Sequence, residues 1–128
     1  MSKIFVFLLM IFCHVIDDFK LQAGVLVNLK QSLWWVENVK PHELWQKCRF
    51  DYIMALIMHG FSWAFMIMLP VAFSMGFYPT GAFYVAFVIN WAVHSFVDDL
   101  KANRFKINLI VDQTIHIVQI ALTAWLLL

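Results

Sequence analysis

The sequence predicts an all-α integral membrane bundle of about four transmembrane helices, with an interfacial segment between the first and the second. Three observations lead to this fold class. Hydrophobic residues make up 63% of the 128 residues and charged residues only 13%, whereas a typical soluble domain carries roughly 25% charged residues. The mean hydropathy is +0.79, and the chain has 13 Phe and 6 Trp. A soluble domain this small has too large a surface for its volume to bury so much apolar material, so lipid is the expected solvent.

The first predicted span covers residues 3–23. Its purely apolar part, Ile4–Ile16, is too short to cross a bilayer alone, because about 20 residues are needed. The span therefore has to carry His14, Asp17 and Asp18 into or close to the membrane. A charged residue before an apolar run is also typical of a signal peptide, but no small-residue cleavage site follows. We therefore interpret this segment as a retained span.

Residues 25–50 are predicted to form an amphipathic or interfacial segment. Trp34, Trp35 and Trp45 stand among Lys, Arg and Glu residues, and this mixture is typical of a helix that lies on the bilayer surface. Pro41 is expected to divide the segment, since proline interrupts a helix. An ordinary loop whose aromatic residues pack on the bundle fits the same composition equally well.

Three more spans are predicted, at residues 52–75, 82–98 and 107–128, so the chain forms a single transmembrane domain (1–128). The first of these holds no charged residue apart from His59, which is charged only when protonated. This uncharged stretch, which continues to Thr80, is long enough to cross the hydrocarbon core. A tight uncharged turn and a short charged connection are expected to join them.

The basic residues set the expected orientation. With four spans, segment 25–50 and connection 99–106 lie on the same side of the membrane, and of the nine basic residues only Lys3 lies on the other side. By the positive-inside rule, both charged segments face the cytoplasm. We therefore expect a multi-pass protein of the inner (cytoplasmic) membrane with both termini outside. The residues that set this bias are Lys20, Lys30, Lys40, Lys47, Arg49, Lys101, Arg104 and Lys106.

Polar residues recur at a spacing of four in three of the predicted spans. Residues at i and i+4 lie on one face of a helix, so each of these spans has one polar stripe on an otherwise apolar surface. The second span adds His59, and all of these groups lie in the cytoplasmic half of their spans. The stripes are His14, Asp18 and Gln22; Asn90, His94 and Asp98; and Asn108, Asp112 and His116.

The stripes are expected to face the inside of the bundle and to hold a metal. An Asp at the centre of a membrane helix costs roughly 2.5–3.5 kcal/mol on insertion scales, so several of them facing lipid would oppose insertion. His and carboxylate are good ligands for Zn²⁺, Mn²⁺ or Fe²⁺, and we expect one or two such ions as cofactor. A lone buried His is more often a packing residue, and Asn and Gln more often join helices. The predicted metal ligands are His14, Asp18, His59, His94, Asp98, Asp112 and His116.

Four further polar residues are interpreted separately. Asp17 and Asp99 stand beside stripe residues but off the stripe, so we expect them at the membrane interface or in contact with the ligands. His42 lies in the polar segment and is expected to be solvated. Lys101, one turn beyond Asp98, is expected to pair with Asp98, to bind a phosphate or to extend to the lipid head groups.

The sequence leaves three functions open. The leading one is a metal-dependent membrane hydrolase that acts on a lipid or phosphate-containing substrate, with Asp18, Asp98 and Lys101 as catalytic residues. The second is an ion or proton transporter, because buried Asp and His residues also mark ion pathways. The third is a non-enzymatic phage or defence protein that acts through a host membrane protein. A homo-oligomer fits each of these, whereas no nucleic-acid partner is expected, because the basic residues are not clustered with aromatic ones.

Four motifs follow one another along the chain, namely His14-x3-Asp18-Phe19-x-Leu21-Gln22, His59, His94-x3-Asp98-x2-Lys101 and Asp112-Gln113-x2-His116. In this order, and over nearly the whole chain, they resemble a family of small bacterial and phage membrane proteins of uncharacterised function. The pattern is also loosely similar to inner-membrane proteins described as metal-dependent hydrolases. The resemblance implies a polytopic architecture and a His/Asp site, but no substrate. The doubled acids Asp17–Asp18 and Asp98–Asp99 depart from the family pattern and leave the choice of ligand open.

Overall fold

The computed structural model describes residues 1–21 and 24–128, apart from the side chain of His42. The predictions for Gln22 and for the solvation of His42 lie outside the described residues. Every regular element in the described part is helical, which confirms the all-α class. The elements are α1 (Lys3–Ile16), the π-helical turn η1 (Asp17–Leu21), α2 (Val25–Leu29), α3 (Ser32–Asn38), α4 (His42–Cys48), α5 (Asp51–Ser74), α6 (Gly81–Ala102) and α7 (Leu109–Leu127).

The first helix changes its geometry before the end of the predicted span 3–23. α1 begins at Ser2, whose hydroxyl accepts a hydrogen bond from the Phe5 amide at 3.2 Å, as serine often does at a helix start. After α1 the chain continues as the π-helical turn η1, which is wider than an α-helical turn and is often found at functional sites. The wider turn places Asp17 inside the bundle, where it is 1% exposed. Of the two positions predicted for Asp17, the membrane interface and contact with the ligands, only the second agrees with this burial, since Asp17 Oδ2 lies 3.5 Å from His59 Nδ1.

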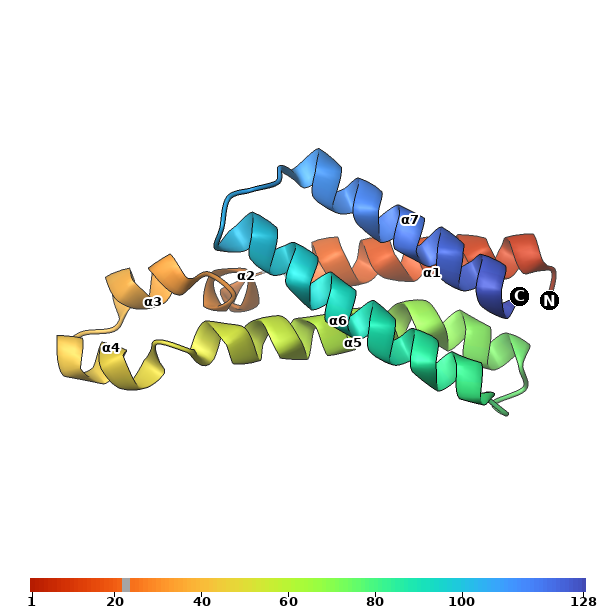
Figure 1. The fold of residues 1–128 in the computed structure, drawn as a ribbon, viewed down its shortest axis with the longest axis horizontal. Coiled ribbons are helices and arrows are strands. Elements are labelled where there is room, and N and C mark those ends of the chain that lie inside the picture. The colour runs from red at the N-terminus through yellow and green to blue at the C-terminus, as the bar shows by residue number, and fades with distance from the viewer. Residues whose placement is uncertain (22–23) are drawn as a thin grey trace.

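Segment 25–50 forms three short helices, α2, α3 and α4. Pro41 directly precedes α4, which confirms that proline divides the segment. The helices α3 and α4 extend beyond the end of the long helices (Figure 1). Lys30 ends α2, and the Asn103 side chain beyond α6 donates a hydrogen bond to the Lys30 carbonyl at 3.1 Å. Asn103 also accepts from the Ser32 amide at 2.7 Å, so the start of the segment is tied to the end of α6.

The three long helices follow the predicted spans with two differences. α5 and α7 agree with 52–75 and 107–128 to within two residues at each end. α6 continues four residues beyond 82–98, because the charged residues at its end are paired inside the protein and do not stop the helix. α7 begins after Asn108, whose side chain accepts a hydrogen bond from the Val111 amide at 2.9 Å. Asn108 is therefore a helix cap and not a member of the polar stripe.

The long helices pack side by side, with both termini at the same end of the bundle (Figure 1). α5 contacts α1 and α6, and α7 contacts α6 and α1. At the end that holds the termini, the interior of the bundle is apolar. The buried residues of this apolar core are Val6, Met10, Trp63, Ala64, Ile67, Met68, Val71, Phe83, Ala86, Ile120 and Ala124.

Among the residues that the structure describes, two helical stretches are long and apolar enough to cross a membrane. They are Glu43–Ser74, which contains α4 and α5, and Leu109–Leu127. The outer surface of the bundle carries many large apolar side chains, such as Trp125 at 83% exposure and Tyr84 at 59%. Most of the buried side chains at the end away from the termini are instead His, Asp and Lys, with Leu56 and Val97 beside them.

Candidate metal centre

All seven predicted ligands meet between the long helices, at the end of the bundle away from the termini. Three of them, His94, Asp112 and His116, are completely buried. Their role as ligands stays a prediction, but the structure confirms that the polar stripes turn toward one another. The seven come from α1 (His14), η1 (Asp18), α5 (His59), α6 (His94 and Asp98) and α7 (Asp112 and His116).

Three histidines form a row across the cluster. His94 Nε2 lies 2.8 Å from His59 Nε2, and His94 Nδ1 lies 3.2 Å from His116 Nδ1. The Trp63 indole stacks on the His94 ring, with centroids 4.1 Å apart and 14° between the planes. Trp63 Nε1 also donates a hydrogen bond to His14 Nδ1 at 2.8 Å. Trp63 therefore fixes the His94 ring and leaves only Nε2 of His14 for a ligand role.

The first candidate ligand group consists of Asp18, His59 and His94, whose ligand atoms lie within 4.8 Å of one another. Asp18 Oδ1 is 3.6 Å from His59 Nε2 and 3.8 Å from His94 Nε2. Asp98 Oδ2 lies 3.5 Å from His59 Nε2. Ligand atoms around a tetrahedral ion, each at about 2.1 Å from it, stand about 3.4 Å apart. The other distances already suit such an ion. The two Nε2 atoms of His59 and His94, now 2.8 Å apart, would have to separate to about 3.4 Å.

The second candidate ligand group consists of His94, Asp98 and His116, and Asp112 stands directly beside it. His116 Nε2 lies 3.4 Å from Asp112 Oδ1 and 3.8 Å from Asp98 Oδ1. Both Asp112 Oδ1 and His116 Nε2 are buried, and neither has a hydrogen-bond partner among the described residues. Buried polar atoms are almost always hydrogen-bonded. The two atoms form an ion pair with each other when His116 is protonated, and a divalent cation between them would bind both when His116 is neutral.

Two lysines neutralise part of the carboxylate charge. Lys30 Nζ donates to Asp98 Oδ2 at 2.6 Å, and Lys101 Nζ donates to Asp112 Oδ2 at 2.6 Å. Lys101 Nζ also lies 3.6 Å from Asp98 Oδ1, so the predicted pairing of these two residues is present, with a closer contact to Asp112. The side chain of Lys30 is 7% exposed and that of Lys101 is 30% exposed. Lys101 is therefore the cation of the cluster that solvent or a ligand can reach.

Lys30 and Gln113 complete the cluster in ways that the stripes did not predict. Gln113 Nε2 donates to Asp18 Oδ2 at 2.9 Å and to Asp112 Oδ2 at 3.0 Å, so it ties η1 to α7. Its place directly after Asp112 in the fourth motif was the available signal. Lys30 follows a short helix without periodicity, so only the excess of buried acids over bases could have indicated a further cation.

The two off-stripe aspartates behave differently. Asp17 Oδ1 accepts a hydrogen bond from Ser62 at 2.7 Å, and its Oδ2, which has no hydrogen-bond partner in the described part of the chain, faces His59 Nδ1 at 3.5 Å. A carboxylate behind one ring nitrogen is typical of a metal-binding His, because it leaves the other nitrogen for the ion. Asp99 pairs with Arg104 at 2.7 Å near the surface. Asp17 thus supports the centre, whereas Asp99 lies outside it.

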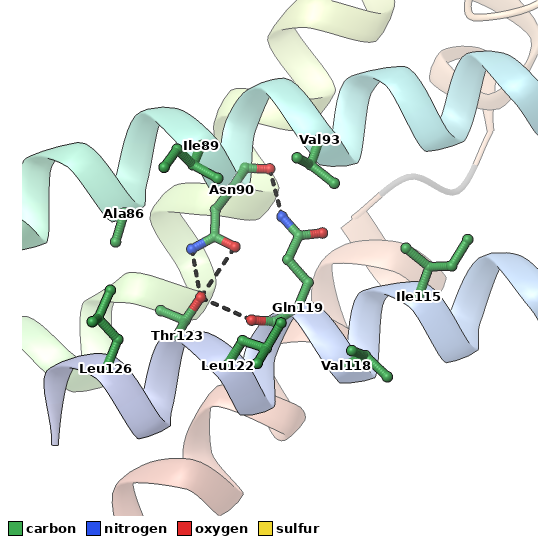
Figure 2. A pocket seen from close by; sticks show the side chains of 10 residues that line it. All are labelled: Ala86, Ile89, Asn90, Val93, Ile115, Val118, Gln119, Leu122, Thr123 and Leu126. Atoms are coloured by element: carbon green, nitrogen blue, oxygen red, sulfur yellow. Dashed lines mark hydrogen bonds between the residues drawn. The ribbon is translucent and has the colours of Figure 1, made fainter.

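A separate polar group lies between α6 and α7 in the apolar half of the bundle (Figure 2). Asn90 Nδ2 donates to Thr123 Oγ1 at 2.8 Å, and Gln119 Nε2 donates to the Asn90 carbonyl at 2.9 Å. These side chains form the floor of an apolar groove of about 320 Å³. Asn90 therefore joins two helices, as amides commonly do in membranes, and it takes no part in the metal centre.

No protein-family model, curated protein or solved structure matches this chain. The resemblance to the small bacterial and phage membrane proteins therefore stays a prediction from motifs. The geometry defines the class of protein: an all-α bundle with a buried His/Asp cluster that could hold a divalent metal ion.

Proposed function

We propose that this protein is a polytopic membrane protein with a divalent-metal centre near the cytoplasmic face, and that this centre hydrolyses a lipid or phosphate-containing substrate. The observation that carries the proposal is the pair of buried atoms Asp112 Oδ1 and His116 Nε2, which lie 3.4 Å apart without hydrogen-bond partners in the described structure. A hydrogen bond between them would be about 2.7–3.2 Å long. The mixture of imidazole and carboxylate suits Zn²⁺, Mn²⁺ or Fe²⁺.

The distribution of polar side chains supports the location in a membrane. The bundle is apolar outside and charged inside at one end, the reverse of the usual soluble arrangement. α5 and α7 have the length and composition of spans. α1 with η1, and α6, supply the other two crossings, because their charged residues turn into the cluster and not toward lipid. Four crossings then place the basic residues of 25–50 and 99–106 in the cytoplasm and both termini outside.

The proposed reaction is attack of water on an ester of the substrate. A bound divalent ion lowers the pKa of its water to about 7 and so supplies a nucleophile at neutral pH. Asp18, whose carboxylate faces the candidate ligand histidines and is held by Gln113, would accept the proton of the attacking water. The water oxygen would bond to the phosphorus or carbonyl carbon while the ester bond breaks, and Asp18 would pass the proton to the leaving oxygen. Lys101 binds the anionic part of the substrate, and Asp98 keeps the ligand groups together.

A proton relay is the second candidate function, and the row of histidines favours it. The nitrogen–nitrogen distances of 2.8 and 3.2 Å are hydrogen-bond distances, as a chain of proton transfers requires. A relay across the membrane also needs a polar path through the other half. In the described part of that half, Ile67 and Ile120 are completely buried in an apolar core. Proton flux into liposomes that carry the wild-type protein would favour the relay, and its absence would favour the hydrolase.

Elemental analysis tests the proposed centre. Protein purified in detergent without chelator is supplied with Zn²⁺, Mn²⁺ or Fe²⁺ and freed of excess metal. We expect at least one ion per wild-type chain and a loss of bound metal in His94→Gln, because His94 belongs to both ligand groups. Asp99→Asn is the matched control, since Asp99 pairs with Arg104 outside the cluster. Circular dichroism checks that each variant keeps its helices.

Two outcomes contradict this proposal. One is wild-type protein without stoichiometric metal, and the other is folded His94→Gln that binds as much metal as the wild type. Either would favour the non-enzymatic interaction function, in which the buried polar network is purely structural. If metal binds, hydrolysis of an artificial phosphodiester, lost on chelation and restored by the ion, tests the reaction itself.

A further inference from the structure

We infer that the centre holds two divalent ions bridged by Asp98, and that the second ion is bound together with a phosphate-type anion. This inference rests on the proposed metal centre and gives its stoichiometry and the class of its substrate. Asp98 reaches both ligand groups through different oxygens. Its Oδ2 faces His59 Nε2 at 3.5 Å, and its Oδ1 faces His116 Nε2 at 3.8 Å. One carboxylate can therefore join two ions at the spacing of about 3.5–4 Å that is usual in two-metal hydrolytic sites.

The first ion has a complete set of protein ligands. Asp18, His59 and His94 offer ligand atoms within 4.8 Å of one another. Asp98 Oδ2, 3.5 Å from His59 Nε2, would be the fourth ligand of a tetrahedral site. Asp17 Oδ2 faces His59 Nδ1 at 3.5 Å, which favours metal binding at Nε2. The four atoms are Asp18 Oδ1, His59 Nε2, His94 Nε2 and Asp98 Oδ2.

The second ion has three protein ligands and room for a fourth from outside. His116 Nε2 faces Asp112 Oδ1 at 3.4 Å and Asp98 Oδ1 at 3.8 Å, and neither His116 Nε2 nor Asp112 Oδ1 has a hydrogen-bond partner among the described residues. Three protein ligands with one open position are typical of catalytic sites. Lys101 Nζ stands beside two of the ligands and is partly exposed. An anion on the second ion would therefore also meet a cation of the protein.

The net charge of the buried side chains determines whether each metal ion needs an accompanying anion. Among the described residues, four aspartates face the cluster and two lysines oppose them, so the cluster carries two negative charges when its histidines are neutral, as metal ligands are. One divalent ion neutralises this charge. A second leaves two positive charges in a buried site, which is unfavourable unless negative charge accompanies it. A phosphate dianion, or a hydroxide together with a phosphodiester, supplies that charge. The charged groups are Asp17, Asp18, Asp98, Asp112, Lys30 and Lys101.

Metal counting with and without phosphate tests the inference. Purified full-length protein in detergent is dialysed against Mn²⁺, with or without inorganic phosphate, and bound Mn²⁺ is counted per chain. We expect one ion without phosphate and two with it, with at least tenfold tighter binding of the second ion. Electron paramagnetic resonance should then show two coupled Mn²⁺ ions. Parallel samples with anionic phospholipid micelles or with a soluble phosphodiester show whether a lipid head group or a free ester promotes the second ion.

Single substitutions separate the two positions. Asp112→Asn should bind one ion with or without phosphate, because Asp112 contacts only the second position. His59→Gln should weaken the first ion, and Asp98→Asn should abolish the coupled signal. Asp99→Asn should behave like the wild type. If Asp98→Asn does not fold, Asp112→Asn and Asp99→Asn still give the comparison.

The outcomes distinguish this inference from the proposed function. One ion per wild-type chain in all conditions overturns the two-ion centre and leaves the metal site standing. Two ions in the absence of any phosphate overturn the link between the second ion and the anion. Complete absence of bound metal overturns the proposed metal centre itself.

Discussion

The two ends of the bundle are joined by opposite kinds of contact. At the end with the termini, the helices meet through completely buried apolar side chains such as Met10, Ile67 and Ile120. At the other end, the same helices meet through buried His, Asp and Lys side chains. In the proposed membrane location, close packing and not exclusion of water would hold the apolar end together. The polar end depends on pairing of charges, so a single substitution should affect the two ends in different ways.

On each long helix, the residues of the face that points into the bundle change from polar at one end to apolar at the other. The buried residues follow one another at a spacing of four, which keeps them on one side of the helix, and they pass from polar to apolar toward the end with the termini. One face thus serves as ligand support at one end and as packing surface at the other. The series are His14, Met10 and Val6 in α1; His59, Trp63, Ile67 and Val71 in α5; Asp98, His94, Asn90 and Ala86 in α6; and Asp112, His116, Ile120 and Ala124 in α7.

Lys30→Met should give the largest effect, confined to the polar end. Methionine is of similar length but carries no charge, so the buried Asp98 carboxylate loses a donor at 2.6 Å. Removing one partner of a buried ion pair costs about 3–5 kcal/mol. We expect thermal unfolding in detergent, followed by circular dichroism, to shift strongly downward in chelator and less in saturating Zn²⁺, because the ion compensates Asp98.

Arg104→Met is the matched control for this substitution. Arg104 forms a pair with Asp99 of nearly the same length, 2.7 Å, but its side chain is 54% exposed. Exposed pairs contribute about 0–1 kcal/mol. Equal destabilisation by the two variants, or an effect of Lys30→Met that Zn²⁺ leaves unchanged, would show that burial of charge does not distinguish this end.

Ile67→Ala should give the next largest effect, and only on stability. Ile67 is completely buried in the apolar core, and truncation of such a residue to Ala costs about 2–5 kcal/mol. The candidate metal ligand on the same helix, His59, lies eight residues away, so bound Mn²⁺ per folded chain should stay unchanged. Phe65→Ala on the outer face, where Phe65 is 51% exposed, should cost much less. Loss of metal from folded Ile67→Ala would mean that the ends are not independent.

The periodic part of this arrangement could be predicted from the sequence, and the irregular part could not. The stripes of α1, α6 and α7 follow from the helical period alone, so His14, His94 and His116 could be expected together. The place of Lys30 in the cluster could not be predicted. It depends on the hydrogen bond that the Asn103 side chain donates to the Lys30 carbonyl, and these two residues are far apart in the sequence. The same holds for η1, since no local signal distinguishes a π-helical turn from the α-helix before it.

Gly60→Ala should give the smallest of the three effects, but it should reach both ends. Gly60 is buried beside His59 in α5 and faces α6, where an added Cβ would overlap Ser95 Oγ and stand 3.1 Å from the Trp91 carbonyl oxygen. Such overpacking costs about 1–3 kcal/mol. The strain pushes apart the helices that carry His59 and His94, which are 2.8 Å apart. Reduced stability should therefore come with weaker Mn²⁺ binding.

The double variant Gly60→Ala with Ser95→Ala identifies the cause. Ser95→Ala removes the hydroxyl that the new Cβ overlaps, while the tight approach to the Trp91 backbone remains. The double variant should therefore recover part of both the stability and the Mn²⁺ affinity. Recovery of stability without recovery of affinity would mean that the spacing of α5 and α6 at Gly60 does not set the distance between the ligands. Recovery of both would show that the apolar packing fixes the geometry of the polar end, although the two ends are joined by different contacts.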